Sequence, residues 1–256
     1  MNIPELHAAA RTALACLDLT GLHDGHDLAG GEAATEALCA RAVGPHGPTA
    51  AVCVWPRLAG LARSLLPPTV RVAAVANFPG GGSDIASALR DTTRIAAAGA
   101  QEVDVVMPYR DLVAAPALLA AVRRECAGLT LKVIVETGEL ADDALIAQAC
   151  RIALDAGADF LKTSTGKRPV AATPASARLL LLAIAADPLA RGRVGFKPAG
   201  GIRTVADAAG YLALTAELLG PAALTPARFR IGASGLLDDI EAVLAGAARP
   251  VPGSTY

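Results

Sequence analysis

Short apolar runs alternate with longer amphipathic segments along the whole chain. The runs are four or five residues long, and polar or turn-forming residues bound them, which is typical of buried strands. We expect strands at Leu14–Asp18, Ala50–Val54, Val70–Ala74, Val103–Met107, Leu131–Val135, Asp159–Thr163, Val194–Lys197 and Phe229–Gly232. Segments such as Asp84–Ala98 and Leu140–Asp155 carry apolar residues at helical spacing between them, and Gly99, Gly157 and Gly210 lie at or near the predicted helix ends.

This alternation predicts an α/β protein with a parallel sheet. Eight strand–helix units in 256 residues match a (β/α)8 TIM barrel, which takes about 250 residues. An open doubly wound sheet has the same alternation and is the alternative. The strand count and the position of the glycine turns favour the barrel. We therefore expect a single barrel domain over residues 1–256, with a short N-terminal helix and a mobile C-terminal tail at 249–256.

Composition narrows the classes of partner. Apolar residues make up 53% of the chain, charged residues 18% and aromatic residues 3%, and the net charge is −1. This balance argues against nucleic acid or an anionic membrane as a partner. The longest apolar run, Leu179–Ala186, is far shorter than the roughly 20 residues of a membrane span, and Met1–Ala10 lacks the pattern of a signal peptide. Five cysteines without a Cys-x-x-Cys pair favour a reducing cytoplasm over disulfides or structural zinc.

Two lysines stand at the ends of apolar strand-like runs. Lys162 ends the run Asp159–Lys162, and Lys197 ends the run Val194–Lys197. A lysine at the close of a buried strand is costly, because an ammonium group resists leaving water. A neutral lysine forms a Schiff base with a carbonyl compound, and a second cation nearby lowers its pKa. The pair therefore points to Schiff-base chemistry.

Strand parity places further polar residues beside these lysines. Alternate residues of a strand face opposite sides, and the bulky apolar faces pack on helices. This turns Lys162, Lys197, Asp104 and Cys53 towards the barrel interior, with Asp18 of the first strand as a further candidate. The alternative interpretation is a structural ionic cluster without a catalytic role. For Cys53 the alternative is an inert, buried small hydrophobe.

Glycine turns follow three of the late strands and predict a phosphate site. Backbone N–H groups at such turns and at helix N-termini bind phosphate, and the loops after strands 7 and 8 of a barrel are its usual location. The alternative is that these glycines only make tight turns. The predicted phosphate-binding residues are Gly166, Lys167, Gly200, Gly201, Arg203, Gly232 and Ser234.

A metal site is poorly supported. The four histidines (7, 23, 26 and 46) all lie in the first fifth of the chain. The stretch His23–Asp27 has metal-ligand residue types, but it is more typical of a polar loop before a helix. We expect no metal.

Several longer motifs occur in the same order as in one enzyme family. They are Leu17–Thr20, Val52–Pro56, Asn77–Pro79, Gln101–Val106, Leu131–Leu140, Gly157–Lys167, Val194–Thr204 and Arg230–Ser234. On these motifs the chain resembles deoxyribose-phosphate aldolases, from about residue 12 to the C-terminus. The two lysine-bearing motifs are the longest and the most specific.

The resemblance implies a cytoplasmic class I aldolase of deoxyribonucleotide catabolism. It would cleave 2-deoxy-D-ribose 5-phosphate reversibly to acetaldehyde and D-glyceraldehyde 3-phosphate, without a cofactor, and it favours a homodimer. By motif position, Lys162 would be the Schiff-base nucleophile, Lys197 would lower its pKa, and Asp104 would take part in proton relay. The implied substrate-binding residues are Asp18, Thr20, Cys53, Thr165 and the phosphate-binding residues named above.

Two C-terminal positions call for separate tests. Gly235 stands where related chains often carry a second serine, so the phosphate site is expected to have one hydroxyl group fewer and to bind phosphate more weakly. The chain ends in Tyr256, and our hypothesis is that its phenol assists proton transfer at the nascent methyl carbon. A merely disordered end is the alternative.

Two rival functions remain at this stage. One is another Schiff-base sugar-phosphate aldolase or a transaldolase-like barrel. The other is a non-catalytic barrel that binds a sugar phosphate. Lys162, Lys197 and Asp104 together argue against a binder, which has no need of a lysine with a lowered pKa.

Overall fold

Eight parallel strands form a closed barrel in the computed structural model, which describes residues 1–22 and 28–247. The strands are β1 Leu17–Thr20, β2 Ala51–Val54, β3 Arg71–Ala76, β4 Glu102–Val106, β5 Thr130–Ile134, β6 Phe160–Lys162, β7 Gly195–Lys197 and β8 Ile231–Ala233. Each pairs in parallel with its neighbour in sequence from β1 to β7, and β8 pairs with β1. Bridges Phe196–Phe229 and Ala199–Gly232 join β7 to the β8 segment and close the ring. The predicted barrel is confirmed, and the open sheet is excluded.

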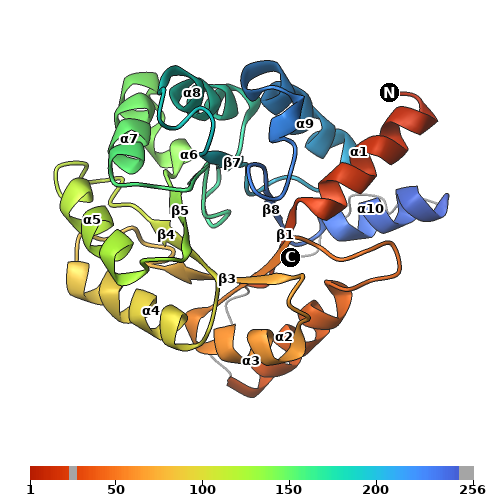
Figure 1. Ribbon diagram of the computed structural model, residues 1–256, viewed down its shortest axis with the longest axis horizontal. Coiled ribbons are helices and arrows are strands. Elements are labelled where there is room, and N and C mark those ends of the chain that lie inside the picture. The colour runs from red at the N-terminus through yellow and green to blue at the C-terminus, as the bar shows by residue number, and fades with distance from the viewer. Residues whose placement is uncertain (23–27, 248–256) are drawn as a thin grey trace.

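Helices surround the ring of strands (Figure 1). They are α1 Ile3–Ala15, α2 Leu28–Arg41, α3 Ala59–Leu65, α4 Ile85–Ala97, α5 Ala115–Glu125, α6 Thr137–Leu140, α7 Asp143–Asp155, α8 Pro174–Ala186, α9 Val205–Leu219 and α10 Leu236–Ala245, with short 3-10 turns η1 Pro56–Leu58 and η2 Pro221–Ala223. The N-terminal helix α1 packs against α9 and α10, beside the seam between β8 and β1.

The two faces of the strands divide apolar from charged residues. The apolar faces, with residues such as Val103, Val105 and Phe196, join the core between the barrel and the helices. The intervening positions point into the barrel, as strand parity predicts. Gly195 of β7 shows this, because a Cβ there would overlap the ring of Phe160, its partner on the neighbouring strand β6. The side chains that carry the chemistry therefore come from the inner faces of the strands.

The first predicted strand, Leu14–Asp18, began too early. Helix α1 continues to Ala15, and the strand runs from Leu17 to Thr20. A capping box at Asn2 and Glu5 starts this helix, and Leu14 is buried on the same helical face as Ala10. The apolar run at Leu14 therefore belongs to the periodicity of a helix.

The helix predicted over Leu140–Asp155 was wrong at its start. The chain forms α6 up to Leu140, turns through Ala141 in the left-handed region, and begins α7 at Asp143. The Asp142 side chain caps α7 by accepting the N–H of Leu145 at 2.9 Å.

Of the three predicted terminal glycines, two are confirmed. Gly99 and Gly157 follow α4 and α7 with positive φ, as helix ends require. Gly210 was misassigned, because it lies inside α9, which ends at Gly220. The apolar flank of α9, with Ala208 and Tyr211 buried, maintains the helix across this glycine.

Some predictions fall on parts of the chain that the structure leaves undescribed. The tail at 249–256 and the residues His23, Asp24, His26 and Asp27 lie outside the described residues. Within the described part, no helix has both the length and the apolar character that crossing a membrane requires.

Candidate active site

Three lysines converge on one carboxylate inside the barrel. Asp104 of β4 accepts from Lys162 of β6 at 2.8 Å and from Lys197 of β7 at 2.7 Å, both through Oδ2. Its Oδ1 accepts from Lys132 of β5 at 2.7 Å. Register explains the convergence, because Lys162 pairs with Lys197 across β6 and β7, and Asp104 pairs with Lys132 across β4 and β5. The structure therefore brings the three predicted catalytic residues together.

A second layer of charge lies beside this lysine group. Asp18 of β1 accepts from Lys197 at 2.5 Å and from Arg230 at 2.6 Å. Glu102 of β4 pairs with Arg230 at 2.8 Å and with Lys132 at 2.5 Å. We call these seven buried residues the ionic cluster: Asp18, Glu102, Asp104, Lys132, Lys162, Lys197 and Arg230.

Three members of the ionic cluster had no assigned role in the sequence analysis. They are Glu102, Lys132 and Arg230. The signal was present, since Lys132 interrupts an apolar strand run and Glu102 shares strand parity with Asp104. Only the structure shows that Lys132 and Arg230 bind the carboxylates of Asp104 and Asp18, and that Glu102 pairs with both of these basic residues.

Lys162 differs from the other two lysines in both surroundings and pKa. Burial lowers the pKa of Lys162; the Asp104 carboxylate opposes this, and the charge of Lys197 lowers the pKa further. Burial acts on Lys197 as well, but Asp104 and Asp18 hold its pKa above the ordinary value. Carboxylates likewise raise the pKa of Lys132 against the effect of burial. Of the three lysines, Lys162 is therefore the one that gives up its proton most readily.

The exposed fraction of the residue also distinguishes Lys162 from the other two lysines. Lys162 retains 3% of its surface, whereas Lys132 and Lys197 retain none. Lys162 is thus the least enclosed of the three lysines.

Asp104 stays ionised in this setting. Burial alone would raise its pKa, but Lys132, Lys162 and Lys197 hold the pKa well below its usual range. Its Oδ2 lies within hydrogen-bond distance of two amino groups, so it can pass a proton between them or to a bound intermediate.

Cys53 and Thr20 lie next to the cluster on paired positions of β2 and β1. The Cys53 sulfur is 4.0 Å from Asp104 Oδ2, and burial raises the pKa of this thiol. It is therefore a neutral thiol that lines the site. Thr20 is half-buried, and its hydroxyl donates to the carbonyl oxygen of Asp18 at 2.9 Å.

The predicted phosphate loops lie together at the carboxyl end of the barrel. Gly166 and Gly200, from the loops after β6 and β7, adopt positive φ and approach so closely that a Cβ on Gly200 would lie 3.0 Å from the Gly166 Cα. Gly200 also donates its N–H to the Gly232 carbonyl of β8 at 3.3 Å. Thr165 is buried, and its hydroxyl oxygen accepts the N–H of Lys167 at 3.0 Å.

The remaining predicted residues fall into three groups. Gly201, Arg203 and Ser234 are exposed, the first two after β7 and the last just before α10. Gly232 points inward, where a Cβ would lie 3.1 Å from the Lys197 Cε, so a glycine there leaves room for that lysine. Tyr256 lies outside the described residues.

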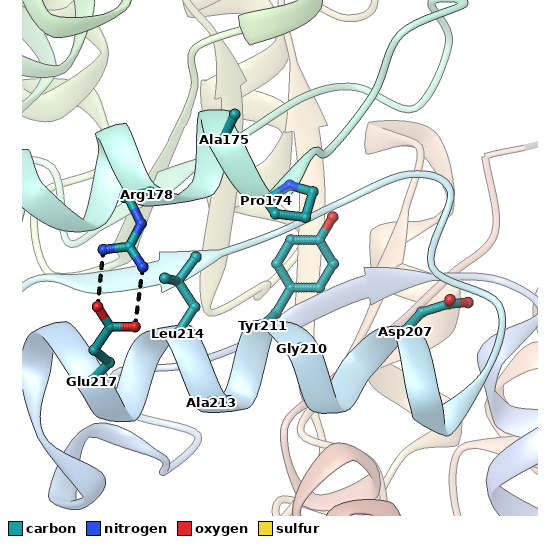
Figure 2. A pocket seen from close by; sticks show the side chains of 9 residues that line it. All are labelled: Pro174, Ala175, Arg178, Asp207, Gly210, Tyr211, Ala213, Leu214 and Glu217. Carbon is teal, nitrogen blue, oxygen red and sulfur yellow. Dashed lines mark hydrogen bonds and ion pairs between the residues drawn. The ribbon is translucent and has the colours of Figure 1, made fainter. Parts of the chain in front are cut away.

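A separate groove of about 410 Å³ lies between α8 and α9. Pro174, Tyr211 and Leu214 line it, and Arg178 and Glu217 form an ion pair at one end (Figure 2). It shares no residue with the ionic cluster or the predicted phosphate loops.

Comparisons with known proteins identify the family of the chain. Residues 12–238 match the model of the DeoC/LacD family aldolases. A deoxyribose-phosphate aldolase from Agrobacterium fabrum is 45% identical over 264 residues, which cover 100% of this chain and 99% of that protein.

Solved structures agree on the fold. A structure assigned as a deoxyribose-phosphate aldolase from Toxoplasma gondii superposes with a TM-score of 0.85 at 23% identity, covering 96% of this chain and 98% of that one. The tetrameric deoxyribose phosphate aldolase from Aeropyrum pernix gives 0.74 at 24% identity, covering 94% and 96%. The chain belongs to the DeoC/LacD aldolase family.

Proposed function

We propose that this protein is a deoxyribose-phosphate aldolase that cleaves 2-deoxy-D-ribose 5-phosphate reversibly to acetaldehyde and D-glyceraldehyde 3-phosphate. The observation that carries the proposal is the placement of Lys162, a lysine with a lowered pKa, on the same Asp104 oxygen that binds the charged Lys197. The full-length similarity to the Agrobacterium enzyme supports the choice of substrate.

In the proposed mechanism, the neutral Nζ of Lys162 attacks the aldehyde carbon of the open-chain sugar. The resulting carbinolamine loses water and becomes an iminium ion, with Asp104 exchanging the protons through Oδ2. The bond between C2 and C3 then breaks, its electron pair moves into the iminium, and the C3 hydroxyl passes its proton to the Asp104 carboxylate as it becomes the carbonyl of glyceraldehyde phosphate. Protonation of the remaining enamine carbon and hydrolysis release acetaldehyde and free Lys162.

The iminium is the electron sink in this sequence, so the chemistry needs no external cofactor. Lys197 contributes by keeping a positive charge beside Lys162, which favours the free amine before attack. We assign the phosphate of the sugar to the loops after β6, β7 and β8, where Gly166, Gly200 and Gly201 provide backbone and Lys167 provides charge.

Borohydride trapping with acetaldehyde, followed by peptide mass spectrometry, tests the proposal. Borohydride reduces an imine to a secondary amine, so we expect an ethyl adduct on Lys162. An adduct on Lys197 instead would keep the reaction class and reverse the two roles. No adduct on either lysine would contradict the aldolase and favour a sugar-phosphate binder. Use of acetaldehyde as the donor separates this enzyme from a transaldolase-like barrel.

The proposal includes a cytoplasmic homodimer. All five cysteines are free and buried, which suits a reducing compartment. The dimer is inferred from the family resemblance, and the Aeropyrum relative is described as a tetramer. Sedimentation equilibrium of the purified protein distinguishes the two assemblies.

A further inference from the structure

Glu136 has a conformation and a set of contacts that the proposed mechanism does not use. It follows β5, its side chain is fully buried, and its backbone lies in the left-handed region with φ 59° and ψ 57°. For a residue with a Cβ this region is unfavourable, and such residues persist where the surroundings hold them.

The Glu136 carboxylate binds the loop that follows the nucleophile strand. The N–H of Thr165 donates to both carboxylate oxygens, at 3.2 and 3.3 Å, and the Thr165 side chain also bonds to Glu136. The Thr165 hydroxyl oxygen in turn accepts the N–H of Lys167 at 3.0 Å. A chain of contacts therefore runs from Glu136 through Thr165 to the Gly166–Lys167 turn.

Neighbouring residues hold the same two segments together. Thr137 donates its N–H to the Thr163 carbonyl at 3.0 Å. Gly138 lies so close to Val170 that a Cβ at 138 would overlap the Val170 carbonyl oxygen. The turn between β5 and α6 thus supports the loop after β6 at its beginning, its middle and its far side.

We propose that Glu136 is a positioning residue for phosphate binding: its carboxylate fixes Thr165 so that the Gly166–Lys167 turn faces the sugar phosphate. This inference rests on the proposed function, because it takes the phosphate to lie at that turn. Glu136 touches neither the phosphate nor the reacting carbons in this scheme, and it acts through the loop backbone.

The direction in which phosphate affinity changes when Glu136 is substituted distinguishes a positioning role from simple electrostatic repulsion. A buried carboxylate near a phosphate repels it, so removal of the charge alone would tighten binding. Loss of positioning weakens binding, because the loop then has to be ordered when the substrate binds. Glu136→Gln keeps the shape and one acceptor oxygen, but it cannot accept through both oxygens.

The experiment compares steady-state kinetics on 2-deoxy-D-ribose 5-phosphate and on 2-deoxy-D-ribose, which has the same reacting carbons without the phosphate. For Glu136→Gln we expect KM for the phosphorylated sugar to rise about tenfold, the change that corresponds to roughly one hydrogen bond. We expect kcat, and kcat/KM for the unphosphorylated sugar, to change by less than about threefold, a difference of under about 0.7 kcal/mol.

Glu139→Gln is the matched control. Glu139 lies on the same turn, is exposed, and pairs with Arg110 at 3.0 Å. Glu139→Gln removes one negative charge, as Glu136→Gln does, but leaves the hydrogen bonds of Thr165 in place. KM for the phosphorylated sugar should therefore stay level or fall.

Borohydride trapping of acetaldehyde on Lys162 and the melting temperature report on the fold of each variant. Equal losses with both sugars and in trapping would assign Glu136 a general structural role and overturn the inference, as would an unchanged or lower KM. If the wild-type protein traps no acetaldehyde, the proposed function fails, and the inference fails with it.

Discussion

Charge balance inside the barrel favours a neutral Lys162. The ionic cluster holds four basic residues and three carboxylates, all buried and joined by ion pairs. With every member ionised it carries one uncompensated positive charge, which is costly away from water. Among the residues that the structure describes, Lys162 pairs with one carboxylate, Asp104, which it shares with Lys132 and Lys197. It is therefore the member that gives up its proton at the lowest cost.

This charge balance predicts that two matched substitutions change the stability of the protein to different extents. Lys132→Met leaves buried carboxylates uncompensated, so we expect it to lower the free energy of unfolding by about 3 to 5 kcal/mol. Lys162→Met removes only a neutral amine and should leave stability within about 1 kcal/mol of wild type while abolishing turnover. Urea denaturation of both variants checks this, and equal destabilisation would contradict the charge assignment.

A second residue-scale prediction concerns pH. Schiff-base formation needs the free amine, so its rate rises with pH through the pKa of Lys162. That pKa is lowered by burial and by the charge of Lys197. Lys197→Met removes the neighbouring cation and frees Asp104 and Asp18, and both effects raise the pKa of Lys162. In this variant, the pH at which the rate of Schiff-base formation rises should therefore be higher. At pH 7 that rate should be at least about tenfold lower than in wild type, which corresponds to a pKa rise of one unit.

The dependence on pH is measured as the initial rate at which acetaldehyde forms a borohydride-trappable adduct between pH 5 and 10. A Lys197→Met profile that coincides with wild type would show that Lys197 does not set the basicity of Lys162.

At the scale of elements, the turn between β8 and α10 forms one side of the predicted phosphate site. Gly235 is the N-cap residue of α10, with ordinary backbone angles, φ −96° and ψ −6°. Apart from its own helix and its chain neighbours, no atom of the described residues lies within 4 Å of the position that a Cβ would take there. The position thus accepts a serine without strain.

Gly235→Ser is therefore expected to lower KM for 2-deoxy-D-ribose 5-phosphate by up to about fivefold, since a new hydroxyl adds about 1 kcal/mol of hydrogen bonding. Serine is also at least as good an N-cap as glycine, so α10 should not lose stability. Initial-rate kinetics on the phosphorylated sugar decide this, and an unchanged KM would place the phosphate away from Ser234 and Gly235.

Element boundaries show what the sequence could predict. Eight strands could be placed because buried parallel strands are continuous apolar runs, and strand parity then turned Asp104, Lys162 and Lys197 inward. The start at Leu14 was wrong because an apolar run in a helix looks the same over five residues. The partners of Lys132 and Arg230 depend on which strands are neighbours across the barrel, a relation that local patterns do not contain.

At the scale of the whole molecule, the barrel interior is tightly filled below the lysines. Phe160 lies under the guanidinium of Arg230, 5.7 Å from its central carbon to the ring centroid, and Gly195 leaves the space that this ring occupies. Interiors packed in this way resist added methyl groups.

We expect Gly195→Ala to lower the free energy of unfolding by about 1 to 3 kcal/mol, because the new Cβ overlaps the Phe160 ring. Gly192→Ala is the control, since no atom in the described part of the chain, other than its neighbours in sequence, lies within 4 Å of its Cβ position. Chemical denaturation of the pair tests the prediction, which is wrong if both variants match wild type.

The C-terminal residue also belongs to this scale. Tyr256 lies outside the described residues, and its role stays a prediction. Deletion of Tyr256 is expected to slow the exchange of acetaldehyde methyl protons with deuterated water, followed by NMR, while trapping on Lys162 persists. Full exchange activity in the truncated protein would rule out a catalytic role for its phenol.

The origin of the two halves of the site has a practical consequence for redesign. The proposed nucleophile, relay carboxylate and neighbouring cation come from strands of the barrel, whereas the proposed phosphate site comes from surface turns. Enzymes of this architecture diversify through such turns on an unchanged frame. Libraries confined to the turns around Gly201, Ser234 and Gly235 are thus a route to catalysts for unphosphorylated acceptor aldehydes that retain the reactive amine.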